Sequence, residues 1–160
     1  MRGIDQALVD EVWRETAGFP PGRVEAEARA FLGRQPHVAA FCQAETREQD
    51  AAVQKAAFGL GFLLFRILER SLGQPFPLLA EEDIAAAHEA TGEWLRRIES
   101  ADPAAVLKAV DDPAHPTLVS YILAVFYGDG AAGCDERVRA SLFLMLRTLS
   151  DALDLGEVEA

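Results

Sequence analysis

One stretch of the sequence, Phe58 to Phe65, would be apolar on every side of a helix. It lies within the longer segment Ala51 to Leu72, which opens with polar residues. A helix without a polar face is stable in water when other helices surround it, and the alternative is a membrane span of about 20 apolar residues. Lys55 and Arg66 leave too short an apolar run for a span. The segment is therefore predicted to be the central helix of a soluble helical bundle.

Two glycines, Gly59 and Gly61, lie inside this predicted helix. Each costs about 1 kcal/mol in a helix interior relative to alanine. Their presence indicates that another helix or a ligand comes close to the backbone at this point.

The length and charge of the chain limit its fold and its partners. A chain of 160 residues buries about 70% of its unfolded surface, so it can fold without a disulfide or a structural metal. We expect one helical domain over residues 1–155, followed by an acidic, frayed tail at 156–160. The net charge of −11 would repel phosphate backbones and anionic lipid surfaces. Nucleic acid is therefore not expected as a partner.

The two cysteines, Cys42 and Cys134, lie far apart, and the chain opens without an apolar signal region. This pattern predicts a reducing, cytoplasmic setting. Cys42 follows Phe41 in an apolar segment and is expected in the core. Cys134 is expected near a helix start, with acidic residues beside it.

Periodic apolar residues, with proline or glycine at the boundaries, predict seven further helices. They are expected at about 5–16, 21–33, 36–44, 82–99, 102–111, 118–126 and 135–153. A capping box of Thr46 and Gln49 would start the central helix, although a helix continuous with the preceding one remains an alternative. The predicted fold class is all-α, a single-domain helical bundle of about seven to eight helices.

The two halves of the chain, 1–79 and 80–155, resemble each other at an offset of about 80 residues. Trp13 then matches Trp94, and Arg66 matches Arg147. One interpretation is an internal duplication, with two pseudo-symmetric four-helix halves. The other is that any two runs of four helices align somewhere, because proline recurs at helix starts and leucine in cores.

The segment 82–99 carries an apolar stripe that contains His88 and Thr91 between Ile84 and Leu95. Buried polar groups must be hydrogen-bonded or lose roughly 1 to 3 kcal/mol. The pair is predicted either to be satisfied within the core, or to form the wall of a pocket.

Arg66 and Arg147 are guanidinium groups within otherwise apolar runs. A structural role is one interpretation, because long stems cover apolar surface and this acidic chain offers many carboxylates. The other is an anion or carboxylate site between the two halves, since arginine suits bidentate recognition.

Residues typical of metal, cofactor or nucleophilic sites do not form a recognisable pattern in this sequence. The position three residues before His88 is Ala85, so the Glu and His spacing of helical di-iron proteins is absent. No serine or cysteine has a visible histidine and aspartate arrangement. No metal, cofactor or catalytic residue is therefore predicted.

The sequence is typical of a non-catalytic interaction module, such as an adaptor or assembly chaperone, that binds a protein partner or a second copy of itself. A homodimer is favoured, because two strongly apolar helices need extensive cover. The alternative is a small-molecule-binding or enzymatic bundle with a cavity near His88 and Arg66. The candidate ligand-binding residues are Gly59, Gly61, Arg66, His88, Thr91 and Arg147.

Overall fold

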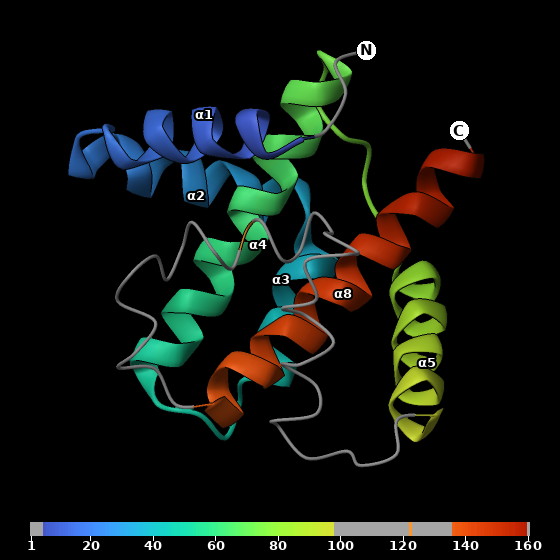
Figure 1. Ribbon diagram of the computed structural model, residues 1–160. Coiled ribbons are helices and arrows are strands. Elements are labelled where there is room, and N and C mark those ends of the chain that lie inside the picture. Colours follow the sequence, from blue (N-terminus) through green and yellow to red (C-terminus); the bar gives the residue numbers. More distant parts are fainter. Residues whose placement is uncertain (1–4, 98–121, 123–135, 160) are drawn as a thin grey trace. The chain divides into compact units, whose positions relative to one another are not determined.

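The computed structural model describes residues 5–97, 122 and 136–159 (Figure 1). Every regular element within these residues is a helix, so the all-α prediction is confirmed for this part of the chain. The six helices are α1 (Gln6–Ala17), α2 (Pro21–Arg34), α3 (Pro36–Glu45), α4 (Ala51–Leu72), α5 (Glu81–Arg97) and α8 (Glu136–Glu159). The helices predicted near 102–111 and 118–126, and Cys134, lie outside the described residues, apart from Ile122, which is helical and buried.

The chain divides into two compact units, unit 1 (Met1–Leu78) and unit 2 (Leu79–Ala160). This boundary falls one residue before the boundary of the predicted duplication at 79 and 80. The duplication itself stays a prediction.

Unit 1 is built around α4, which α1, α2 and α3 each contact. Nine of the residues of α4 are buried, among them the run from Leu60 to Phe65. This helix is also the one helix of the described residues with the length and hydropathy to cross a membrane. In unit 1 three other helices cover α4, and this burial also accounts for its apolar composition.

The ends of α4 follow from local chemistry. The Asp50 side chain accepts a hydrogen bond from the Val53 backbone N–H at 3.0 Å and caps the first turn. Gly73 ends the helix in the left-handed region, with φ at 75°, and its N–H bonds to the Glu69 carbonyl. The predicted bounds 51–72 are confirmed, and the break before residue 51 excludes one continuous helix.

The capping box predicted at Thr46 and Gln49 is wrong. Thr46 instead ends α3, and its hydroxyl donates to the Cys42 carbonyl at 2.7 Å. The Gln54 side chain donates to the carbonyls of Thr46 and Gln49, both at 3.1 Å. The aspartate immediately before the helix outcompetes Thr46, because its carboxylate reaches the free N–H groups of the first turn.

An aromatic cluster of Phe31, Phe62, Phe65 and Phe76 joins α2, α4 and the segment after α4. Ring centroids are 5.3 Å apart for Phe31 and Phe65, and 5.8 Å for Phe65 and Phe76. The Gln35 side chain, also buried, donates to the Pro77 carbonyl at 2.9 Å. The proline-rich segment after Gly73 is thus fixed against unit 1 although it forms no helix.

In unit 2, α5 packs against α8. The buried residues of α5 are Ile84, Ala87 and Thr91. The buried side chains of α8 lie between Ala140 and Leu153, and all of them are apolar except Thr148. The backbone of α8 is helical to Glu159, beyond its predicted end at 153.

Candidate functional site

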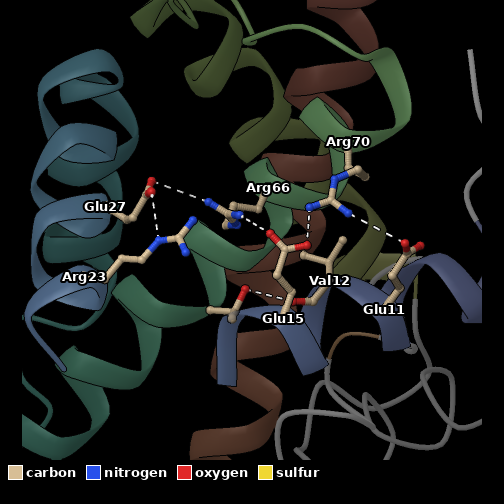
Figure 2. A network of polar contacts seen from close by, with 8 residues as sticks. Glu11, Val12, Glu15, Arg23, Glu27, Arg66 and Arg70 are labelled. Carbon is tan, nitrogen blue, oxygen red and sulfur yellow. Dashed lines mark hydrogen bonds and ion pairs between the residues drawn. The ribbon is translucent and has the colours of Figure 1, made fainter. Parts of the chain in front are cut away.

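Alternating carboxylates and guanidinium groups connect α1, α4 and α2 in unit 1 (Figure 2). We call this row the charge ladder, and its members in spatial order are Glu11, Arg70, Glu15, Arg66, Glu27 and Arg23.

The centre of the charge ladder is Glu15, whose two carboxylate oxygens bind two different arginines. Its Oε1 lies 2.9 Å from Nη2 of Arg66, and its Oε2 accepts a hydrogen bond from Nη2 of Arg70. Arg66 also reaches Glu27, with 3.5 Å between Nη1 and Oε2. The outer pairs are longer, at 3.8 Å for Arg70 with Glu11 and for Arg23 with Glu27.

Helical spacing explains why these charges line up. Glu11 and Glu15 are four residues apart on α1, as are Arg66 and Arg70 on α4, so each pair lies on one face of its helix. Like charges at this spacing repel within an isolated helix. Packing α1 on α4 places the two rows against each other and turns the repulsion into attraction.

The Glu15 carboxylate responds to these partners. Its pKa is lowered chiefly by the hydrogen bond from Arg70, with the charges of Arg70 and Arg66 acting in the same direction and burial opposing them. Glu15 is therefore held in its ionised form in the folded protein.

Aromatic rings lie beside Arg66 and Arg23 in the charge ladder. The Phe19 ring lies 3.9 Å from the guanidinium carbon of Arg23 and 5.1 Å from that of Arg66. The Phe62 ring lies 5.7 Å from Arg66. The Nε of Arg66 is buried without a hydrogen-bond partner among the described residues, while both of its amino groups are bonded.

Beside the charge ladder lies an open pocket of about 410 Å³, at the C-terminal end of α4. Its lining residues are Arg34, Arg66, Glu69, Arg70, Gly73 and Pro75. Glu69 lies 3.5 Å from Arg34 and accepts a hydrogen bond from the Phe76 backbone N–H at 2.8 Å. The arrangement can hold an anionic group, because three guanidinium groups meet one carboxylate.

Arg147 has a different environment in unit 2. Its guanidinium lies 4.1 Å from the centre of the Trp94 ring, which also contacts Phe143 at 6.0 Å between centroids. Burial raises the pKa of Asp151, one turn along α8, and the charge of Arg147 lowers it without overcoming that effect.

The predicted buried pair of His88 and Thr91 is only half correct. Thr91 is buried, and its hydroxyl oxygen lies 2.9 Å from that of Thr148, whose hydroxyl is also 2.9 Å from the Leu144 carbonyl. His88 is exposed. The buried position one turn after Ile84 is Ala87, because a spacing of three and then four residues suits a helix as well as four and then three.

The two glycines of α4 differ in their surroundings. A methyl group built on Gly61 would lie 3.5 Å from the Cys42 sulfur on α3, which is an ordinary van der Waals contact, so α3 packs beside this residue without requiring a glycine. Gly59 is half-buried. Of the six candidate residues, Gly59, Gly61 and Arg66 belong to unit 1, and His88, Thr91 and Arg147 belong to unit 2.

No group of three or more histidine, cysteine, aspartate or glutamate side chains suited to a metal occurs among the described residues. Cys42 is buried, as predicted, and burial raises the pKa of its thiol to about 12. The thiol is thus protonated and unreactive at neutral pH.

Sequence reasoning missed Arg34, Arg70 and Glu15, which complete the site around Arg66. The available signal was the pair of four-residue spacings, between Glu11 and Glu15 and between Arg66 and Arg70. Comparison with protein-family models, curated proteins and solved structures gives no match for this chain.

Proposed function

We propose that this chain is a non-catalytic, cytoplasmic interaction module that uses α2 as its contact helix. The observation that supports this is the exposure of α2, since Phe31 is the one buried residue among its 14. The other residues of α2 are exposed or half-buried, so most of the surface of this helix is available to a protein partner.

The exposed surface of α2 includes two apolar side chains. Val24 and Leu32 are 37% and 36% exposed, and their spacing of eight residues brings them onto neighbouring parts of one face. Leu78, outside α2, is 59% exposed. These three are the large hydrophobic residues exposed in the described part of the chain, and all belong to unit 1.

A second copy of the chain is the partner we favour, in a twofold homodimer. In such a dimer the same patch is used by both copies, so one apolar helix face suffices. The net charge of −11 opposes the approach of two copies, but charge repulsion is screened beyond about 8 Å at physiological salt, whereas apolar burial is not. Moderate salt is therefore expected to strengthen the dimer. Neither nucleic acid nor a membrane is part of this proposal.

Sedimentation equilibrium across protein concentration and salt tests the proposal. The double variant Val24→Glu with Leu32→Glu should be monomeric where the unmodified chain is dimeric. Ala26→Glu is the matched control, because it adds a carboxylate to the same helix on the opposite face and should leave the dimer intact.

A monomer mass that persists at tens of micromolar protein in moderate salt would show that self-association is wrong. Affinity purification with the tagged chain then tests for another protein partner. If the unmodified chain recovers no partner that the double variant loses, the interaction role of α2 falls as well.

We also propose that the chain arose by duplication, with four helices in each half. What supports this is that the first and last helices of each unit pack together, α1 with α4 and α5 with α8. An experimental structure of the full chain that describes residues 98–135 tests it, because the duplication requires two helices between α5 and α8. A strand or a single long helix in that segment would contradict the duplication.

A further inference from the structure

The pocket at the end of α4 differs in charge from the chain as a whole. Its lining residues include three arginines and one glutamate, which gives a formal charge of +2 (three positive, one negative). The complete chain carries −11. The lining therefore offers guanidinium groups to a small anion on a protein whose net charge is strongly negative.

The carboxylates that pair with Arg66 and Arg70 do not line the pocket. Glu11 and Glu15 belong to α1 and Glu27 belongs to α2, and none is among the lining residues. The one lining carboxylate, Glu69, already accepts a hydrogen bond from the Phe76 N–H and pairs with Arg34. Glu69 is thus the one carboxylate of the lining that an anionic ligand would meet.

The arginines of the pocket retain hydrogen-bonding capacity. A guanidinium carries five N–H donors in a planar fork that matches carboxylate and phosphate oxygens. Arg66 donates one hydrogen bond from each of its two amino groups, to Glu27 and Glu15, so the second N–H of each is left for a ligand. Glu15 shows that one oxyanion can be held jointly by Arg66 and Arg70, which lie one turn apart.

We propose that Arg34, Arg66 and Arg70 form a binding site for a small molecule that carries carboxylate or phosphate groups. The volume of about 410 Å³ falls in the range of small-ligand sites, which is about 300 to 1,000 Å³. Glu69 limits the tolerated negative charge, so a ligand with one to three oxyanion groups fits better than a polyphosphate. This site is independent of the proposed contact surface, because Val24 and Leu32 are not among its lining residues.

Isothermal titration calorimetry of the full chain with citrate and with inorganic phosphate tests the site, using chloride at matched ionic strength as reference. We expect saturable binding of at least one of the two anions. Arg34→Gln should weaken it about tenfold or more, the effect of losing one charge-assisted hydrogen bond. Arg34 is 48% exposed and outside the charge ladder, so this variant should keep its helical circular dichroism spectrum.

Arg29→Gln is the matched control. It removes the same charge from the same helix at an exposed side chain, but Arg29 is neither in the charge ladder nor among the residues that line the pocket. Its binding should stay within about twofold of the unmodified chain, and the double variant Val24→Glu with Leu32→Glu should also bind normally.

The outcomes separate the alternatives. Binding of citrate alone identifies a carboxylate ligand, and binding of phosphate alone identifies a phosphate ester. Heats no larger than those of chloride for both anions would overturn the proposal. Equal weakening by Arg29→Gln and Arg34→Gln would also overturn it, because general attraction to positive charge would then explain the binding.

Discussion

Arg66 in unit 1 and Arg147 in unit 2 each lie within an otherwise apolar run of the sequence but are stabilised in different ways. Arg66 lies between two carboxylates, Glu15 and Glu27. Arg147 lies over the face of Trp94. An arginine within an apolar run can therefore be accommodated either by ion pairs or by an aromatic ring, and the sequence around it does not distinguish the two.

The carboxylates near these arginines show the same contrast. Hydrogen bonding to Arg70 lowers the pKa of Glu15, whereas burial raises the pKa of Asp151 despite the charge of Arg147. A nearby guanidinium lowers the pKa of a carboxyl group only when its attraction for the carboxylate outweighs the hydration that the carboxylate loses on burial. Unit 1 meets this condition at Glu15, and unit 2 does not meet it at Asp151.

The largest expected difference between the two sites is in stability. Arg66→Met should lower the free energy of unfolding of unit 1 by about 1–3 kcal/mol, between the values for exposed and buried ion pairs, because its side chain is 19% exposed. Arg147→Met should cost unit 2 about 1 kcal/mol or less. Denaturant unfolding followed by fluorine NMR of 5-fluorotryptophan reports both units, since Trp13 and Trp94 lie one in each.

Arg29→Met serves as the control for this first comparison, because Arg29 is exposed on α2. It should change stability by no more than about 0.5 kcal/mol. Equal losses for Arg66→Met and Arg147→Met would show that the two arginines are stabilised alike.

The second difference is the response to pH, which should have opposite sign in the two units. The folded-state pKa of Glu15 is lowered, so its contribution is present above the unfolded value near 4.5 and is lost as the pH falls through the folded value. The folded-state pKa of Asp151 is raised from 3.8, so unit 2 loses stability as the pH rises from 3.8 through the folded value.

Two amide variants separate these effects. At pH 7, Glu15→Gln should destabilise unit 1 and Asp151→Asn should stabilise unit 2, and at pH 3 both effects should shrink. Unfolding followed by the same two fluorine signals between pH 3 and 7 measures this. Destabilisation of unit 2 by Asp151→Asn at pH 7 would mean that the attraction of Arg147 outweighs the burial of the Asp151 carboxylate.

The bounds of α4 could be predicted because the information is local. Apolar residues on all sides require burial, Asp50 caps the start and Gly73 permits the left-handed end. The register of α5 could not be predicted in the same way. His88 and Ala87 both fit a helical stripe after Ile84, and only packing against α8 decides which of them is buried.

The candidate site was predictable only in part, because local sequence marks Arg66 but does not mark its partners. Arg66 stands out because its neighbours are apolar, whereas Arg70 follows another charged residue, Glu69, and carries no such signal. Its partner Glu15 lies 55 residues away on another helix. Which face of α1 meets α4 is a property of tertiary packing, so the charge ladder emerges only from the structure.

The smallest expected effect is the coupling between Arg147 and Trp94, measured by a double-mutant cycle with Arg147→Met and Trp94→Leu. The cycle cancels the contact that Trp94 makes with Phe143, because that contact is lost in both variants that lack the indole. We expect a coupling of about 0.5–1 kcal/mol for this cation–π pair. Because the Trp94→Leu variants lack that fluorine signal, hydrogen exchange of the α5 and α8 amides, read by mass spectrometry, measures the free energies of unfolding.

The Trp94 ring carries no net charge, so its attraction for the Arg147 guanidinium 4.1 Å away is between a charge and a quadrupole, and the coupling should change little between about 0.05 M and 0.5 M salt. The parallel cycle of Glu15→Gln with Arg70→Met joins two full charges on side chains that are about one-third exposed, so its coupling should fall with salt. A salt dependence equal in the two cycles would remove the distinction between an arginine held by a ring and one held by carboxylates.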